Sequence, residues 1–477
     1  MQQGTSRVLR LPAQACSFGD DYAHVSTDGR AASDSSAATA VDNAVPPLQQ
    51  SQQDRSGVAS RFLDYDVFQR GEAHLPPTLR VPSLIPDYVK PFVDGHARFK
   101  QIATHYYQLV HPWLPIVSKR KVYDHLLNPL LPLRVDAVFL CLCMQLVSQP
   151  PETESPWTPQ YRAATRFFTD VQAAGVLSME SLQGCILLAT YEMGHAMYPA
   201  AEVSIGTCLK CALVLGMGWT ASSKDALVAM SWADTEERRR TWWAIFILER
   251  TANLGRPQRE LLAPEPTLAE QLPSQEKEWE SGRPGDAVFT LSAPPESLGR
   301  YASVVQATYL LSRVFGHVQD LSVDVRLREE EMVQLDKTLH ALILYSESNA
   351  GTTHSIICCQ TAISFCALFT LSAPYLAHTE PTLRRHAEAV SDNAAYVALA
   401  VAEAYMGAPT MDMKYGDIPP FELPWLYMAG RWFLEKGSLR DFGAIERALT
   451  RLNTKWKSAG IYLELLVARR IMGPTPG

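Results

Sequence analysis

From about residue 97 to the C-terminus, apolar residues recur at the three- and four-residue spacing of amphipathic helices. Local start signals agree with this period: Thr158 precedes a proline suited to a first helical turn, Ser178 is a typical N-cap, and Asp234 with Glu237 has capping-box spacing. Alternating patterns of strand length are absent from the sequence, which therefore predicts an all-α fold. The expected helices are 100–111, 135–147, 160–174, 178–195, 200–217, 234–254, 301–321, 328–348, 354–373, 381–405, 424–435 and 442–470.

Composition divides the chain into three parts. Residues 1–57 are low in complexity and have no usable hydrophobic period, so they cannot offset their ordering entropy and we expect a disordered tail. Residues 58–96 contain short apolar pieces broken by prolines, which predicts an extended lead-in. Residues 97–477 are expected to form one large helical domain, interrupted by a polar loop at about 255–298.

Charge, cysteine content and hydropathy exclude several classes of protein. The net charge is −7, so the bulk of the chain is not expected to be a polyanion-binding surface. The nine cysteines lie mostly in apolar stretches, which indicates reduced thiols in an intracellular protein. The uncharged stretch 356–377 is long enough to cross a bilayer, but it contains polar residues and lacks an aromatic belt. It is interpreted as a core helix, and no membrane partner is expected.

No enzymatic motif is recognisable. Nucleophile-elbow, Walker, dinucleotide-binding and HExxH patterns are all absent from the sequence, so we expect no enzyme and no catalytic, cofactor-binding or metal-binding residues. Cys208 and Cys211 have CxxC spacing, but no second ligand pair accompanies them, and they are interpreted as structural thiols. The acidic residues Asp234, Glu236 and Glu237 are interpreted as a capping and first-turn group rather than as magnesium ligands.

The most distinctive stretch is 236–257. It begins with charged turns, continues into apolar turns with paired tryptophans, and ends in Gly-Arg-Pro. Three consecutive arginines cannot share one helical face, which argues against a DNA-reading stripe and favours ion pairs and packing. The tryptophans bring large apolar area and need partners for their N–H groups. The residues concerned are Glu237, Arg238, Arg239, Arg240, Trp242, Trp243, Gly255, Arg256 and Pro257.

This stretch resembles the signature of the fungal-specific transcription factor domain, the middle homology region of fungal zinc-cluster regulators. In that family an acidic residue precedes a run of arginines, a Trp-rich helix and Gly-Arg-Pro. Two further segments agree in order: residues 106–116 resemble the family's opening aromatic segment, and 198–217 resemble its helix ending in Leu-Gly. The matching residues of the opening segment include His111, Pro112 and Trp113. The resemblance covers about 95–300 and extends by helical character to 477.

The resemblance implies a nuclear transcription regulator whose helical domain controls a metabolic gene set, such as a secondary-metabolite cluster. Family members carry an N-terminal module of six cysteines that binds zinc and reads DNA. Here Cys16 is the only cysteine before position 141, so this chain is expected to lack that module and to hold no cofactor. The expected partners are a second copy or a complete zinc-cluster regulator, promoter DNA indirectly, and a small-molecule effector.

Two other functions stay open. A helical sensor or interaction protein without transcriptional output would use a pocket near the tryptophan helix and the 255–298 loop, since ligands commonly bind between helices. An all-α enzyme is supported by analogy at the level of fold alone.

Overall fold

The all-α prediction is confirmed. A computed structural model shows helices and no strand in the part of the chain that it describes, where one isolated bridge joins Gln271 to Thr290. The tail predicted at 1–57 and most of the lead-in predicted at 58–96 lie outside the described residues. The structure describes Leu63 and residues 85–472, except 152, 219–229, 321, 323, 350–358 and 408–417.

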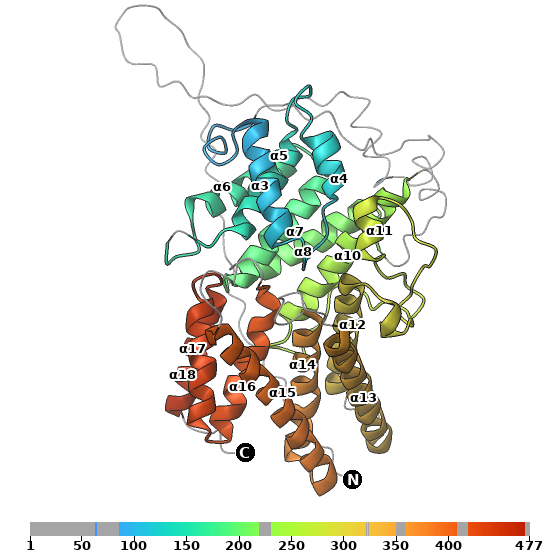
Figure 1. Ribbon diagram of the computed structural model, residues 1–477, viewed down its shortest axis with the longest axis vertical. Helices are drawn as coiled ribbons and strands as arrows, with labels where there is room; N and C mark the ends of the chain where they lie inside the picture. The colour runs from blue at the N-terminus through green and yellow to red at the C-terminus, as the bar shows by residue number, and fades with distance from the viewer. Residues whose placement is uncertain are drawn as a thin grey trace, which may run out of the picture. The chain divides into compact units, whose positions relative to one another are not determined.

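The described helices belong to one compact unit of the chain, residues 48–477 (Figure 1). In chain order they are α3 (Gly95–Leu109), α4 (Lys119–Lys121) with η1 (Val122–Leu126), α5 (Val135–Ser148), α6 (Pro159–Ala173), α7 (Met179–Gly194), α8 (Ala200–Val214), α10 (Trp232–Ala252), α11 (Glu276–Ser281), η2 (Pro295–Ser297), α12 (Arg300–Gln319), α13 (Val325–Asn349), α14 (Cys359–Ser372), η3 (Ala373–Ala377), α15 (Pro381–Gly407), η5 (Pro420–Glu422), α16 (Leu423–Glu435), α17 (Leu439–Leu452) and α18 (Ser458–Met472).

Helix α10 links two groups of helices. In the first group α5 packs against α3, α6 and α7, and α7 packs against α8. In the second, α14 packs against α12, α13, α15 and α16, while α16 also contacts α17 and α18. Helix α10 contacts α7 and α8 on the one hand and α12 on the other, and Figure 1 shows it between the two groups.

Helix α14 lies at the centre of the second group. Every one of its residues is buried. The segment Cys359–Ala377 is long and apolar enough to cross a membrane by length and composition, but 83% of it is buried inside the protein. A helix covered by protein on all sides is a core helix, as its polar interruptions predicted.

Two helix starts follow the predicted caps because capping is a local interaction. Thr158 accepts a hydrogen bond from the Tyr161 amide at 3.1 Å, with Pro159 in the first turn of α6. The Ser178 hydroxyl accepts from the Ser181 amide, and the Ser181 hydroxyl accepts from the Ser178 amide, which closes a capping box at α7.

Several predicted helix boundaries are wrong. The helix predicted at 100–111 is α3, which begins at Gly95 and ends at Leu109. Helix α10 begins at Trp232 and is capped by Ser231, whose hydroxyl accepts from the Asp234 amide at 3.1 Å, so Asp234 lies inside the first turn. Helix α8 ends at Val214 rather than near Met217, because Gly216 takes a positive φ of 73° and reverses the chain earlier than Gly218.

Tertiary packing explains the larger differences. The single helix predicted at 442–470 is two helices, α17 and α18, separated by a connector that buries Lys455 and Trp456. The polar loop predicted at 255–298 contains α11 and η2 and buries Leu272, Trp279 and Leu291. The short helix at 119–126 was not predicted, since it is too short to show a hydrophobic period.

Candidate functional site

The segment after α3 turns into the protein at His111. Trp113 is buried, and its indole N–H donates to the Leu109 carbonyl at 2.9 Å, while Pro112 is exposed. The Trp113 ring meets Phe421 edge-to-face at 5.8 Å between ring centroids. This opening motif therefore joins α3 to η5, about 300 residues later in the chain.

Glu237 of α10 holds the end of the same segment. Its Oε1 accepts from the Ser118 amide at 3.0 Å and from the Gln183 side chain at 2.9 Å, and Lys121 Nζ lies 3.3 Å from its Oε2. Gln183, on α7, also donates to the Ile116 carbonyl at 2.8 Å. Glu237 is only 2% exposed. It is a buried anchor between three elements, which corrects its interpretation as a capping-box residue.

Lys121 completes this anchor from the solvent side. Its ammonium also lies 3.4 Å from Glu180. Burial alone would lower the pKa of Lys121, but the carboxylates of Glu237 and Glu180 raise the pKa above its ordinary value. In the same way Lys121 and Arg134 overcome the effect of burial and lower the pKa of Glu180. Lys121 and Glu180 are therefore both ionised at neutral pH.

The three arginines of the signature all bind within the protein. Arg238 donates to the Leu215 carbonyl at 2.6 Å and so supplies a partner at the C-terminus of α8. Arg239 pairs with Glu236 and donates to the Gln271 side chain at 2.6 Å. The run of basic residues in the second and third turns of α10 is thus used for internal contacts with the chain before and after this helix.

Arg240 is the most buried of the three. Its guanidinium is fully buried and lies 2.8 Å from Glu236 Oε1, which also accepts from the Ser274 amide at 2.8 Å. The guanidinium donates to the Ser274 carbonyl at 2.6 Å and lies over the rings of Trp279 and Tyr301, with centroid distances of 4.9 and 5.6 Å. Glu236 and Arg240 therefore hold the 271–279 segment against α10 and α12.

The remaining signature residues lie along and after α10. Trp243 is fully buried and donates to the Gln271 carbonyl at 3.0 Å, and Trp242 is 5% exposed. Gly255 and Arg256 are exposed, and the Pro257 carbonyl accepts from the Gln319 side chain. The Gly-Arg-Pro turn thus lies at the surface, apart from the buried charges at the start of α10.

A second buried cluster further along α10 was not predicted. Arg250 pairs with Glu249 and with Glu265 (2.8 Å), and it donates to the Ser312 hydroxyl at 2.9 Å. Glu249 accepts from the Ala263 amide at 3.1 Å. The signal for it was present, because charged residues inside an otherwise apolar helix have to find buried partners.

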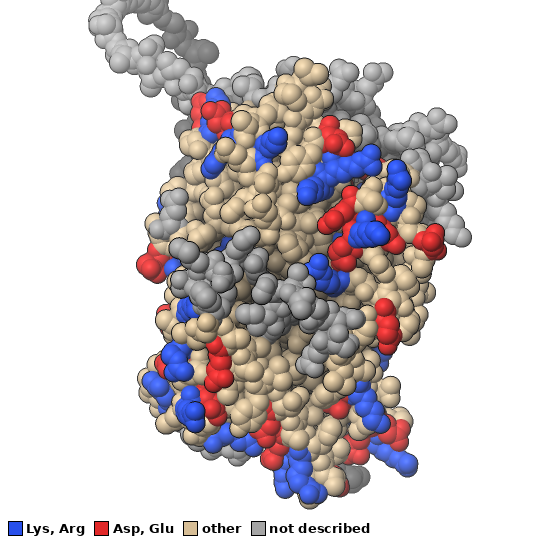
Figure 2. Space-filling view, in the orientation of Figure 1, with Lys and Arg blue, Asp and Glu red and all other residues tan. Residues whose placement is uncertain are grey.

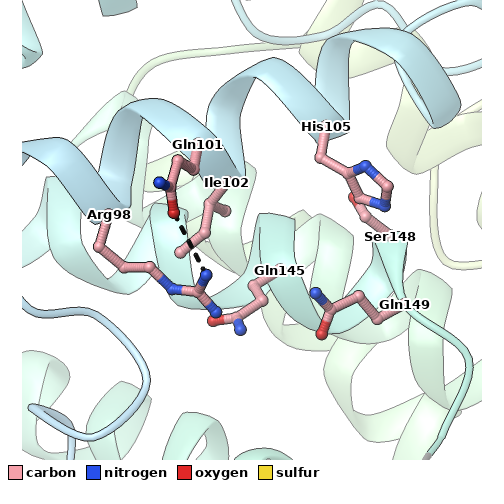
Figure 3. Close-up of a pocket in the computed structure, with 7 residues that line it drawn as sticks. All are labelled: Arg98, Gln101, Ile102, His105, Gln145, Ser148 and Gln149. Carbon is pink, nitrogen blue, oxygen red and sulfur yellow. Dashed lines mark hydrogen bonds between the residues drawn. The ribbon is translucent and has the colours of Figure 1, made fainter.

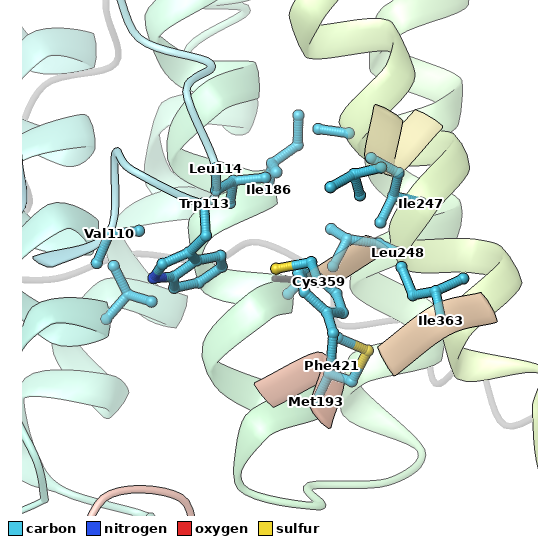
Figure 4. Packing of buried hydrophobic residues seen from close by; sticks show 14 of the residues in the cluster. Val110, Trp113, Leu114, Ile186, Met193, Ile247, Leu248, Cys359, Ile363 and Phe421 are labelled. Atoms are coloured by element: carbon cyan, nitrogen blue, oxygen red, sulfur yellow. The ribbon is translucent and has the colours of Figure 1, made fainter. Parts of the chain in front are cut away.

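The apolar centre of the protein joins the motif segments to α14. Figure 4 shows Trp113 of the opening segment next to Cys359 of α14, with Val110 on one side of this pair and Leu248 of α10 on the other. Leu114 belongs to the same buried cluster. All five side chains are buried. Contacts of this kind exclude water from the ion pairs around α10, which strengthens them.

On the face of the molecule seen in Figure 2, the Lys and Arg side chains of the described residues are interspersed with Asp and Glu. No cluster of three or more His, Cys, Asp or Glu side chains that could hold a metal ion is found within the residues the structure covers. Cys208 is buried, Cys211 is partly exposed and both are free thiols. Burial raises the pKa of the Cys211 thiol to about 11, so the thiol is protonated and poorly nucleophilic at neutral pH.

A groove lies between α3 and α5, away from the position expected from the sequence. Its volume is about 220 Å³ (Figure 3). The expected position, beside the tryptophan helix, is occupied by the side chains of Arg240, Trp279 and Tyr301. Buried Gln145 lines the groove between Phe92 and Arg98. The amide orientation that satisfies both of its polar atoms donates to the Phe92 carbonyl at 3.1 Å and accepts from Arg98 at 2.9 Å. The groove is lined by Arg98, Gln101, Ile102, His105, Gln145, Ser148 and Gln149.

His111 makes the domain sensitive to acid. Burial, with the cations of Arg240 and Lys119 nearby, lowers the pKa of His111 to about 3. Well above pH 6.5 the imidazole is neutral in both the folded and the unfolded chain. Below pH 6.5 only the unfolded chain takes up the proton, so the free energy of unfolding decreases as the pH is lowered. Between pH 6.5 and 5 we expect His111 to cost about 2 kcal/mol. His111→Phe should remove this share of the pH dependence of the free energy of unfolding, measured by urea unfolding at a series of pH values. An unchanged dependence on pH would contradict the role given to His111.

The comparison with known families places the chain in the class that these motifs define. The model of the fungal-specific transcription factor domain matches residues 103–342, the region from α3 to α13 that the signature network holds together. The chain belongs to this family of fungal transcription factors. Family membership implies a nuclear role.

Individual relatives agree with this assignment. Transcription factor BOA15 of Botryotinia fuckeliana is 35% identical over 136 residues, which are 28% of this chain and 76% of that protein. The citrinin biosynthesis transcriptional activator mrl3 of Monascus ruber is 25% identical over 149 residues, or 30% of this chain and 29% of the relative. The pigment biosynthesis transcriptional activator pigB of Monascus ruber is 24% identical over 239 residues, which are 46% of this chain and 42% of that protein. The matches thus span less than half the length of the last two relatives. No solved structure matches the chain at a significant level.

Proposed function

We propose that this chain is a nuclear regulator that controls the transcription of a secondary-metabolite gene cluster through its helical domain. The observation that supports the proposal most directly is the convergence of the three family segments on α10. Glu237 accepts from the Ser118 amide, two residues after the opening segment, and shares Gln183 with the Ile116 carbonyl at the end of that segment. Arg238 binds the end of α8. The relatives named as activators of citrinin and pigment biosynthesis indicate the kind of gene set.

Contact with promoter DNA is proposed to come from a zinc-cluster module outside this sequence, carried by a partner or by a longer product of the same gene. The three arginines of the signature are engaged inside the protein, so they do not form a free row of base-reading side chains. The purified chain alone should fail to bind promoter fragments with the affinity of a specific regulator, roughly 10⁻⁸ to 10⁻¹¹ M. Binding in that range by the isolated chain would overturn this part of the proposal.

Gene deletion tests the regulatory role. Removal of the gene from its fungus should change the transcripts of a contiguous set of biosynthetic genes, and the wild-type gene should restore them. The Arg240→Ala variant, whose buried network is broken, should fail to restore them, whereas Arg259→Ala, at an exposed pair with Glu202, should succeed.

A fluorescent fusion should accumulate in the nucleus. Transcript profiles in which no contiguous biosynthetic gene set responds would overturn the proposal.

A further inference from the structure

Helix α18 has two apolar faces, and only one of them is used inside the protein. Ala459 and Leu466 are fully buried, and α18 packs against α16 and α17. At 100° per residue the opposite face carries Ile461, Leu465 and Met472, which are 42%, 46% and 74% exposed. Large apolar side chains that line up on an exposed helix face commonly mark a contact with another molecule.

The spacing on this outer face is that of a coiled-coil seam. Ile461, Leu465, Ala468 and Met472 are separated by four, three and four residues, as alternating d and a positions of a heptad repeat are. Ala468 is exposed like the other three. The outer face is therefore suited to another helix, because knobs-into-holes packing needs this alternation.

The charges beside the seam identify the helix that fits it. With the seam in d and a positions, Glu464 takes a g position and Arg469 takes the following e position. In a parallel pair of helices, each g residue faces the e residue five positions later on the other helix. Two parallel copies of α18 would thus place Glu464 of each chain opposite Arg469 of the other, twice by symmetry.

Both charged side chains are free to make that contact. Neither Glu464 nor Arg469 forms an ion pair with any residue in the described part of the chain. Arg469 donates through Nε to the Tyr427 hydroxyl at 3.2 Å, a contact that fixes the side chain at the flank of α18 and leaves its terminal nitrogens for a carboxylate. An antiparallel pair would instead bring Glu464 to Ile471, with no such complementarity.

We propose that this chain forms a homodimer in which α18 pairs in parallel with α18 of a second copy. The seam lies on the side of α18 that faces away from α16 and α17, so the two protein bodies fall on opposite sides of the helix pair. Figure 1 shows α18 beside α17 at the edge of its helix group. The helix is already folded and held by its inner face, so pairing does not carry the ordering cost of a free peptide.

Two further apolar residues are exposed near the C-terminal end of the seam. Ile471 is 79% exposed and Leu439, at the start of α17, is 64% exposed. Arg470 lies over the Phe442 ring at 5.7 Å, which brings the two helix ends together. The seam itself spans 12 residues, or about 17 Å along the helix. An interface of this size is small, so the dimer is expected to depend on concentration.

Size-exclusion chromatography with light scattering on the full chain tests the proposal independently of any role in transcription. At high micromolar concentration the wild-type chain should have twice the chain mass of 53.0 kDa. Leu465→Glu should be a monomer with an unchanged circular-dichroism spectrum. The matched control Leu344→Glu replaces a leucine of α13 that is 65% exposed, and it should remain a dimer. A monomeric wild type, or a dimer that survives Leu465→Glu, would overturn the proposal.

A charge reversal tests the parallel orientation. Glu464→Arg and Arg469→Glu should each weaken the dimer at least tenfold, because each places like charges opposite one another on both sides of the seam. Since the reversed charges face each other again, the double variant should recover most of the wild-type affinity. The two single variants mixed together should also form heterodimers. Single variants that dimerise as the wild type does would overturn the parallel pairing.

Discussion

Replacing Arg240 by alanine is expected to lower the free energy of unfolding by about 3–4 kcal/mol, near the lower end for a broken buried ion pair. The substitution removes a fully buried guanidinium 2.8 Å from Glu236 and leaves that carboxylate with Arg239 as its remaining cation. It also removes the cation over the ring of Trp279. Urea unfolding followed by far-UV circular dichroism measures the loss, provided that the slope with urea is unchanged.

Two further variants separate the ion pair from a general loss of charge. Arg259→Ala breaks an exposed pair with Glu202 and should cost only about 0–1 kcal/mol. Glu236→Gln combined with Arg240→Met removes both charges and should recover part of the loss, because no uncompensated charge is then buried. An Arg240→Ala variant as stable as Arg259→Ala would show that the buried network does not hold α10 in solution.

The parts of the fold that sequence reasoning predicted correctly are those determined by neighbouring residues. Thr158 and Ser178 cap helices through hydrogen bonds to amides three residues away, so both helix starts are visible in the sequence. The all-α class follows in the same way from the period of apolar residues. The break between α17 and α18 is different, since the connector is stabilised by Trp456 and Lys455, whose partners lie far away in the sequence.

The candidate site shows the same limit. The sequence identified the arginines and tryptophans of α10 as packing and ion-pair residues, but it placed Glu236 and Glu237 in a capping role. Their partners are Ser274 and Ser118, which are 38 and 119 residues away. A carboxylate near a helix start is usually explained by the helix dipole, so only the fold reveals that these two are buried.

Replacing Trp456 by alanine is expected to lower the free energy of unfolding by about 3–5 kcal/mol, the usual cost of emptying a buried aromatic site. Trp456 is 1% exposed, donates to the Ile418 carbonyl at 2.8 Å and lies 5.3 Å from the His195 ring. It belongs to the connector between α17 and α18, which binds the C-terminal ends of α5 and α7. Lys455 donates to the Val147 carbonyl of α5 at 3.3 Å, and the Trp456 ring lies against Gly194 of α7. The decrease in the free energy of unfolding therefore measures how strongly the C-terminal helices are attached to the first group of helices.

Trp157→Ala, at a site 49% exposed, is the control and should lower the free energy of unfolding by about 1 kcal/mol.

Gly194 supplies the other half of this test because it lies directly against the Trp456 ring. A Cβ atom at Gly194 would clash with Cε3 of Trp456, so Gly194→Ala alone should cost about 1–3 kcal/mol through overpacking. In the Trp456→Ala background the ring is gone and the same substitution fills vacated space, so its cost should largely disappear. The two substitutions should thus be strongly non-additive in urea unfolding, as neighbours in contact are. Costs that simply add would contradict the packing of Trp456 on Gly194.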